Sequence, residues 1–218
     1  MASEPYDHSA NDADSFVALK ILVAGGFGVG KTTLVGSISE IRPLRTEESL
    51  TGAGQSVDDL NGVEHKATTT VAMDFGRITI RDNLCLYLFG TPGQDRFWFL
   101  WDELATGALG AVVLADTRRL EDCFPAVDYF EDRNIPFVVG VNCFDGARRY
   151  QADHVSRALD LDTTIPVVLV DARERESGKS VLITLVKHVS KLQPQVRNES
   201  SPSAAITPGG LPKRPVNR

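Results

Sequence analysis

One short stretch of the sequence has the residue types and spacing of a phosphate-binding loop. Residues 25–32 read Gly-Gly-Phe-Gly-Val-Gly-Lys-Thr and match the pattern GxxxxGK(S/T) at every fixed position. Glycines let the backbone wrap a phosphate, Lys31 reaches the β and γ oxygens, and Thr32 ligates Mg²⁺. A turn that only joins a strand to a helix has no use for the Lys-Thr pair. We therefore expect a nucleoside di- or triphosphate to be bound by Gly25, Gly26, Phe27, Gly28, Val29, Gly30, Lys31, Thr32 and Thr33.

A second polar pair follows a later apolar run. Asn142 and Asp145 stand at NxxD spacing directly after the run at 136–141. Loops at the carboxyl ends of parallel strands form the ligand crevice of α/β proteins. A carboxylate there accepts hydrogen bonds from guanine N1–H and the exocyclic amine, whereas adenine leaves polar groups unpaired. The pair favours guanine; the alternative is an ordinary turn after a strand.

The elements that position these residues are visible as alternating apolar and amphipathic stretches. Continuous apolar runs predict strands whose two faces are both covered by helices, as in a parallel sheet. The run at 71–80 instead alternates, and connects across 81–83 to the next run as an antiparallel hairpin at one edge. The strand candidates are 18–25, 71–80, 84–90, 110–116, 136–142 and 166–171, and the helix candidates are 31–41, 95–106, 121–132, 147–159 and 177–192.

These elements predict an α/β fold: a P-loop three-layer sandwich with a mostly parallel six-stranded sheet, one antiparallel edge strand, and helices on both faces. The folded domain is expected at 16–193. Residues 1–15 and the Pro/Ser-rich residues 194–218 are expected to be disordered tails. The polar segment 42–66 is too long for an ordinary connection, so it is either a functional loop or partly disordered.

Composition excludes several classes of protein. A formal net charge of -6 argues against a nucleic-acid partner, because phosphate-backbone binders need a cationic face. The three cysteines suggest neither a disulfide framework nor a zinc site. No apolar run is long enough to span a membrane, and neither end carries a lipid-anchor motif. We therefore expect a cytoplasmic protein without a direct lipid anchor.

The order of these motifs resembles the Ras-like small GTPase superfamily over about residues 16–193. Besides the phosphate loop and NxxD pair, the chain has a threonine at 70, Gly-Thr-Pro-Gly-Gln at 90–94 and Asp-Ala-Arg at 171–173. The resemblance implies GTP or GDP as ligand with Mg²⁺. It assigns Thr70 to the metal, the Gly93 N–H to the γ-phosphate, and Gln94 to the attacking water. Nucleotide-binding roles also follow for Asn142, Cys143, Asp145, Ala172 and Arg173, with the Ala172 N–H on the guanine carbonyl. Thr51, Thr68 and Thr69 are alternatives to Thr70.

Two positions depart from the superfamily pattern. Gly90 stands where an aspartate is expected, which removes a carboxylate that normally holds the waters of the metal. Cys143 stands where a lysine is expected, which removes an aliphatic stem from one face of the base. We expect both changes to weaken nucleotide or metal binding without abolishing it.

These variations are similar to those of bacterial Ras-like switches, specifically the actinobacterial conservon GTPases, with gliding-motility GTPases as more distant relatives. That resemblance implies two partners: a roadblock-fold protein and a membrane-bound histidine-kinase-like protein, which would recruit the chain to a membrane-bound complex.

The function implied is a molecular switch that hydrolyses GTP slowly and signals to partner proteins. The alternative is a nucleotide-binding interaction module without useful hydrolysis, in which Gln94 is inert. An ATPase or small-molecule kinase is a third reading. The five bulky residues 97–101 are more than one helix face buries, so some are expected to face a partner; otherwise the helix is buried all round.

Overall fold

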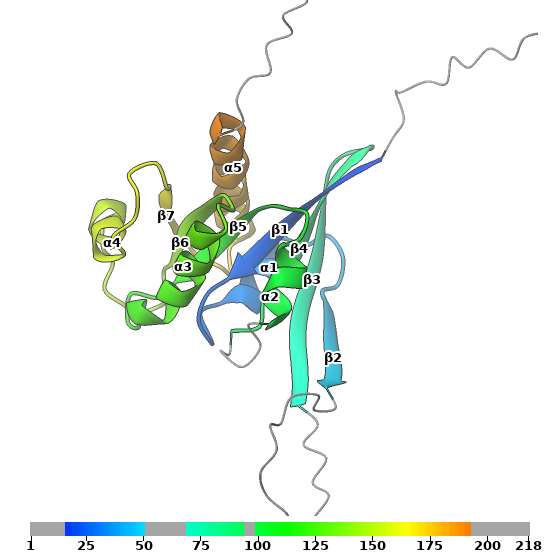
Figure 1. Ribbon diagram of the computed structural model, residues 1–218, viewed down its shortest axis with the longest axis horizontal. Coiled ribbons are helices and arrows are strands. Elements are labelled where there is room, and N and C mark those ends of the chain that lie inside the picture. Colours follow the sequence, from blue (N-terminus) through cyan, green and yellow to red (C-terminus); the bar gives the residue numbers. More distant parts are fainter. Residues whose placement is uncertain (1–15, 51–68, 94–98, 193–218) are drawn as a thin grey trace, which may run out of the picture.

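The computed structural model describes residues 16–50, 69–93 and 99–192 (Figure 1). The predicted tails lie outside the described residues, so the domain boundaries stay predictions. In chain order the elements are β1 (Val17–Ala24), α1 (Lys31–Ile38), β2 (Leu44–Leu50), β3 (Thr69–Arg81), β4 (Leu84–Gly90), α2 (Phe99–Ala105), β5 (Ala108–Ala115), the 3-10 helix η2 (Leu120–Cys123), α3 (Phe124–Asp132), β6 (Phe137–Asn142), α4 (Ala152–Ala158), β7 (Val167–Val170) and α5 (Arg175–Leu192).

The strands form one sheet in the order β2-β3-β4-β1-β5-β6-β7. Five strands run parallel to one another, namely β4, β1, β5, β6 and β7, whereas β3 runs antiparallel to β4. The mostly parallel P-loop sandwich is therefore confirmed, and all six predicted strands are present with their predicted directions. β2 is a further, seventh strand, which pairs antiparallel with β3 from Leu44 opposite Phe75 to Leu50 opposite Thr69, so β3 lies next to the edge.

Helices cover both faces of this sheet (Figure 1). On one face, α1 and α5 enclose a core that contains Leu34, Leu185 and the strand residues Ile21 and Leu88. On the other face, α2, α3 and α4 enclose a second core built around Phe130. The continuous apolar strands are buried from both sides, which is why they lack alternation.

Two helix boundaries differ from the predicted ones. α1 ends at Ile38, because Ser39 adopts an extended backbone, and α4 begins only at Ala152 after an extended Gln151. The residues between β6 and α4 therefore form a loop at the carboxyl edge of the sheet. Among the described residues, no helix is long and apolar enough to cross a membrane.

Candidate functional site

The phosphate loop joins β1 to α1 in a backbone conformation that requires glycine. Gly25 has φ 127° and Gly30 has φ 107°, in the region that L side chains rarely adopt. A Cβ at Gly25 would also collide with the carbonyl oxygen of Leu114 in β5. Gly26 and Val29 are buried, while Phe27 and Gly28 are exposed, and Phe27 is 67% exposed. The loop therefore presents its outer side to a ligand while its base packs on the sheet.

Lys31 is held inside the loop that it follows. Its Nζ donates to the carbonyl oxygens of Gly25 (2.8 Å) and Gly26 (2.7 Å). Burial lowers the pKa of this ammonium group to about 8, and the nearby charge of Asp74 offsets part of that shift. A Cβ at Gly93 would lie 2.5 Å from the Lys31 Nζ. The structure thus brings Gly93 to the phosphate loop.

A carboxylate stands beside Thr32 that the sequence analysis missed. The Thr32 hydroxyl donates to Asp74 Oδ2 over 2.5 Å. Asp74 belongs to β3 and lies opposite Gly90 in the antiparallel register, with its Oδ2 3.2 Å from where a Gly90 Cβ would be. The neighbouring strand therefore places a carboxylate beside Thr32, opposite the position where Gly90 carries none, and the expected weakening of metal binding stays a prediction. The sequence feature that could have identified Asp74 is a carboxylate within the alternating strand at 71–80, and its position opposite Gly90 follows only from the strand pairing.

This donor set fits Mg²⁺, which prefers hydroxyl and carboxylate oxygens together with ligand phosphates. The hydroxyl of Thr91, which follows Gly90, is buried without a hydrogen-bond partner among the described residues. Thr33 is exposed on α1 next to Thr32.

Thr70 lies elsewhere in this arrangement. It belongs to β3, where its backbone pairs with Ser49 of β2, and it lies four residues before Asp74 and thus about 13 Å along the strand. The structure does not bring Thr70 to Thr32, so its role as a metal ligand stays a prediction. Gln94, Thr51 and Thr68 lie outside the described residues, and Thr69 is the first residue of β3.

Asn142 ties the phosphate loop to the last loop of the crevice. The side chain is 7% exposed. Its Nδ2 donates to the Val29 carbonyl (2.9 Å), and its Oδ1 accepts from the Ala172 N–H (3.1 Å). Three segments that are far apart in sequence meet at this amide, which is more than an ordinary turn residue does.

Asp145 stands in the same loop with its carboxylate held by Arg173. The Arg173 guanidinium donates to both Asp145 oxygens, at 2.6 and 3.1 Å, and also to Asp171. These hydrogen bonds lower the pKa of Asp145, lower the pKa of Asp171 to about 2, and raise the pKa of Arg173. The Asp145 side chain is 83% exposed. The Asp145 oxygens, which we expect to accept hydrogen bonds from guanine, therefore face solvent and are both hydrogen-bonded to Arg173.

A second arginine, which the sequence analysis did not assign, supports this loop. Arg118 makes a bidentate pair with Asp116, which is 3% exposed and follows β5. The hydrogen bonds from Arg118 lower the pKa of Asp116. The guanidinium also lies 3.9 Å from the centre of the Phe144 ring. Phe144 lies between Cys143 and Asp145, so Arg118 braces the NxxD loop from the neighbouring strand.

Two further hydrogen bonds involve the backbone of the NxxD loop and of the phosphate loop. The Cys143 N–H donates to the Val170 carbonyl (2.7 Å), which fixes the loop to β7. Arg119 donates to the Phe27 carbonyl (3.0 Å) in the phosphate loop.

The aromatic segment near Gln94 divides between core and surface. Trp101 is 3% exposed, packs on Tyr129 and donates to the Pro92 carbonyl (3.3 Å). Phe99 is 59% exposed. For the described residues of 97–101, the alternative of a helix buried all round is therefore wrong: one ring is core and another faces solvent, as expected if some of these residues are exposed, and the contact with a partner stays a prediction. Phe97 and Trp98 lie outside the described residues.

Comparisons with known proteins show which family this chain belongs to and which proteins it is similar to. The family model "Conserved hypothetical ATP binding protein" matches residues 23–192. The chain is 30% identical over 129 residues to an uncharacterized protein of Methanocaldococcus jannaschii, covering 58% of this chain and 71% of that protein. It is 27% identical over 189 residues to the Ras-related protein SEC4 of Candida albicans, covering 79% and 80%.

Solved structures with the same fold include two FeoB proteins. The cytosolic domain of the T. maritima FeoB iron transporter in a GDP form has a TM-score of 0.57 at 17% identity, and covers 80% of this chain and 64% of that one. The FeoB G-domain of Methanococcus jannaschii has a TM-score of 0.53 at 14% identity, and covers 79% and 98%. These matches show that the chain has the fold of a G-domain, as the resemblance to the Ras-like superfamily implied.

Proposed function

We propose that this chain, which belongs to the family described as conserved hypothetical ATP-binding proteins, is a guanine-nucleotide-binding switch of the Ras-like type. It holds GTP or GDP together with Mg²⁺ and hydrolyses GTP slowly. The observation that carries this proposal is the Asn142 bridge, because it fixes the loop of Asp145 beside the phosphate loop. A nucleotide bound by its phosphates at Lys31 would thus meet a carboxylate at its base.

The base preference is argued from hydrogen-bonding capacity. The Asp145 carboxylate only accepts, and guanine offers two adjacent donors at N1 and the exocyclic amine. The guanine-binding geometry needs the oxygens that Arg173 now engages. An exposed ion pair is weak because water and salt screen it, so guanine displaces Arg173 at little cost. The planar guanidinium is then free to lie against the base.

The phosphate end is argued from charge. Lys31 exchanges two backbone carbonyls for phosphate oxygens when a nucleotide enters. Thr32 and Asp74 would hold Mg²⁺, Thr32 directly and Asp74 directly or through water. When bound, the metal neutralises charge on the β- and γ-phosphates. Gly93 has its backbone beside Lys31, where its N–H would meet the γ-phosphate.

Hydrolysis rests on the resemblance of Gln94, which would orient the attacking water. The same resemblance supports signalling to a roadblock-fold protein and a membrane-bound histidine-kinase-like protein, with the chain in the cytoplasm. The exposed Phe99 is available for such contacts. A switch that binds nucleotide without turnover is the alternative, and Gln94→Leu separates the two, since it slows phosphate release only if Gln94 acts.

A second candidate is an ATP-binding protein, favoured by the description of the family. Adenine would leave the Asp145 oxygens with a single donor at most, and the Asn142–Asp145 spacing would then have no chemical purpose.

The test is the nucleotide content and turnover of the purified protein. Bound ligand is extracted and identified by chromatography, and phosphate release is then followed from GTP and from ATP with Mg²⁺. We expect bound GDP and slow, GTP-selective release. Guanine nucleotide without turnover would support the non-hydrolysing switch, and ATP-selective turnover would overturn the guanine proposal.

A further inference from the structure

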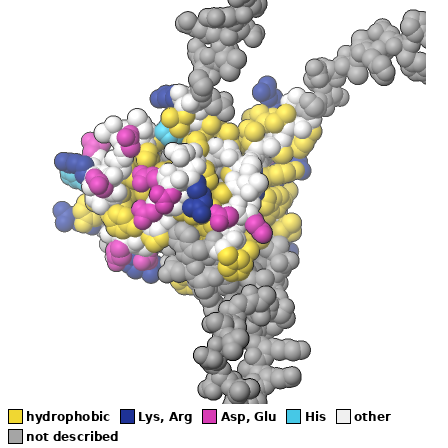
Figure 2. All heavy atoms as spheres, viewed as in Figure 1, with side chains coloured by type: hydrophobic (Ala, Val, Ile, Leu, Met, Phe, Trp, Pro, Cys, Tyr) yellow, Lys and Arg dark blue, Asp and Glu magenta, His cyan; other side chains and the backbone are white. Residues whose placement is uncertain are grey.

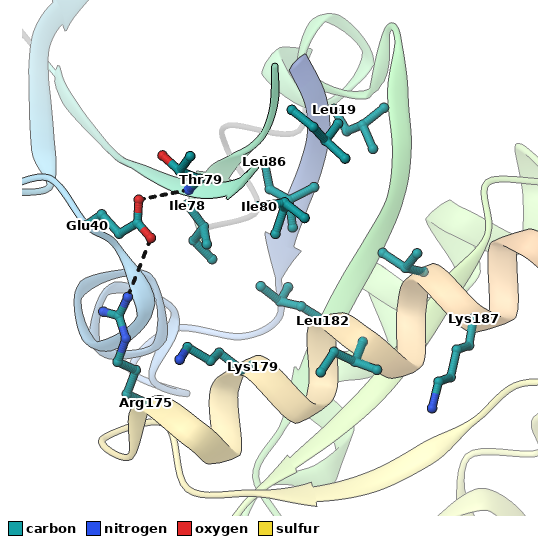
Figure 3. Close-up of a pocket in the computed structure, with 13 residues that line it drawn as sticks. Leu19, Glu40, Ile78, Thr79, Ile80, Leu86, Arg175, Lys179, Leu182 and Lys187 are labelled. Carbon is teal, nitrogen blue, oxygen red and sulfur yellow. Dashed lines mark hydrogen bonds and ion pairs between the residues drawn. The ribbon is translucent and has the colours of Figure 1, made fainter. Parts of the chain in front are cut away.

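A large apolar groove lies on the α1/α5 face of the sheet, away from the nucleotide site (Figure 3). Its volume is about 550 Å³. Leu182 from α5 and Ile78 and Leu86 from the sheet are 4–5% exposed and form its floor. Ile80 (53% exposed) and Ile183 (54% exposed) flank the opening. No residue assigned to the nucleotide site lines this groove.

The groove exists because α1 is too short to cover β3. α1 passes over Gly76, where a Cβ would lie 2.8 Å from Val35 Cγ1, and it ends at Ile38. Beyond Gly76 the same face of β3 continues with Ile78, which is buried at the edge of the α1/α5 core, and with Ile80, which is 53% exposed. Ile80 and Ile183 leave apolar surface exposed at the groove. On the opposite face, seen in Figure 2, hydrophobic side chains are also visible near the start of β1. Exposed apolar surface of this kind in soluble proteins marks a contact site.

The charges around the groove are mostly positive. Its lining includes three cations, Arg175, Lys179 and Lys187, and one anion, Glu40. Arg175 lies 3.9 Å from Glu40 and Lys179 lies 2.8 Å from Glu176. Within the described part of the chain, Lys187 has no ion-pair partner. The occupant that best fits this surface is therefore acidic and partly apolar.

The chain itself carries such a segment next to the groove. Residues 1–15 contain Glu4, Asp7, Asp12 and Asp14, no lysine or arginine, and the apolar pair Pro5-Tyr6. They precede Val17, whose N–H donates to the Asn83 carbonyl and which pairs with Leu84, a lining residue of the groove.

Reach and charge distinguish this segment from the other end of the chain. Fifteen extended residues span up to about 50 Å, whereas the stretch of α5 from Lys179 to Lys187 is about 12 Å long. Residues 193–218 carry four cations, Arg197, Lys213, Arg214 and Arg218, against one anion, Glu199, so the basic rim disfavours them.

We propose that residues 1–15 dock into this groove of the same chain. Tyr6 packs on the apolar floor, and the carboxylates of Glu4 and Asp7 face Lys179 and Lys187. In Figure 3, Glu40 and Arg175 stand at one end of the groove while Leu19 and Lys187 lie towards the other, so the segment enters at the end where β1 begins.

The test is zero-length carbodiimide cross-linking of the full chain, read out by mass spectrometry of its peptides. Lys20 is the matched control: it is much closer in sequence to residues 1–15, but its Nζ donates to the Thr106 carbonyl and lies 5.2 Å from the Phe89 ring, on the other face of the sheet. Docking raises the local concentration of carboxylates, so we expect links to Lys179 and Lys187 to exceed links to Lys20 by at least about threefold. Equal or greater linkage to Lys20 would overturn the proposal.

Two variants on exposed positions of α5 sharpen the result. Ile183→Asn replaces an apolar side chain of the groove by a polar, uncharged one and should reduce the links to Lys187 by about threefold or more, while Ser190→Asn, outside the groove, should leave them unchanged. Equal effects of the two variants would contradict docking in the groove. Mixing ¹⁴N- and ¹⁵N-labelled chains tests for a second copy as the partner, because hybrid-mass links to Lys187 would overturn the intramolecular proposal.

Discussion

At the scale of single residues, the ionisation of Lys31 couples phosphate binding to the stability of the protein. Its pKa is about 8 in the folded protein, against 10.5 for the ordinary side chain. Between these values the unfolded chain binds the proton and the folded chain does not, so the free energy of unfolding rises with pH over this window. Phosphate binding needs the protonated form and should change in the opposite direction.

We therefore predict that GDP affinity falls as the pH rises from 7 to 9, by about tenfold if only the charged ammonium binds. Calorimetric titrations at constant ionic strength measure the affinity, and urea unfolding without nucleotide measures the stability from pH 8 to 10. A GDP affinity that stays constant up to pH 9 would refute the assignment of Lys31 as the phosphate-binding cation.

Asp74 in β3 and Gly90 in β4 lie opposite each other, so exchanging the two residue types would move the carboxylate from one strand to the other. Asp74→Gly removes the carboxylate beside Thr32 and should weaken Mg²⁺-dependent GDP binding by about tenfold or more, as loss of a metal-supporting group does. The double variant Asp74→Gly/Gly90→Asp returns a carboxylate from the facing strand and should recover part of that loss. Affinities measured with and without Mg²⁺ check both statements. If Asp74→Gly leaves the Mg²⁺ dependence intact, the proposed metal site is wrong.

Arg173 should matter less than its four hydrogen bonds to carboxylates suggest. Because the pairs with Asp145 and Asp171 lie in exposed positions, Arg173→Ala is expected to change GDP affinity by less than about fivefold in either direction. Competition binding against a fluorescent GDP analogue measures this. A loss of two orders of magnitude would instead make Arg173 a principal nucleotide ligand.

At the scale of elements, α2 depends on one anchor. Trp101 is buried against Tyr129 and Phe130 and reaches the Pro92 carbonyl, whereas Phe99 in the same helix is exposed. Trp101 thus fixes the helix to the loop that carries Gly93. The helix combines a structural face with a face that is free for a partner.

Truncating each ring separates these two faces. Trp101→Ala should lower the free energy of unfolding by about 3–5 kcal/mol, as expected for a large buried aromatic side chain. Phe99→Ala should change it by no more than about 0.5 kcal/mol, because its ring is largely in water. Urea denaturation of both variants provides the comparison. Similar losses in the two would mean that Phe99 is part of the core.

The strands show which parts of the fold a sequence reveals. The buried parallel strands are continuous apolar runs, so their local composition predicts them. β2, with the sequence LRTEESL, is charged as edge strands often are, and it exists by pairing with β3 some 25 residues away. Local composition does not encode that pairing, so the sequence predicts only a functional loop or a partly disordered segment at 42–66, and this prediction was wrong for Leu44–Leu50.

At the scale of the whole molecule, the candidate site also divides into residues that local sequence predicts and residues that only the contacts between strands reveal. The phosphate loop and the NxxD pair are contiguous motifs, and their positions at one edge of the sheet follow from its parallel topology. Asp74 and Arg118 contribute through contacts between strands, which need the register of β3 against β4 and the order of β5 and β6. The Asn142 bridge lies between these cases: Asn142, Val29 and Ala172 were all predicted as site residues, but the hydrogen bonds that join them were not.

The most direct test of the guanine proposal is the ratio of GDP to ADP affinity in the presence of Mg²⁺, measured for the natural sequence and for Asp145→Asn. We predict at least about 100-fold tighter binding of GDP, because adenine leaves the Asp145 carboxylate unpaired. Asp145→Asn should reduce that ratio to less than about tenfold while ADP affinity stays the same. Equal affinities for GDP and ADP in the natural sequence would contradict the account and favour an ATP-binding protein.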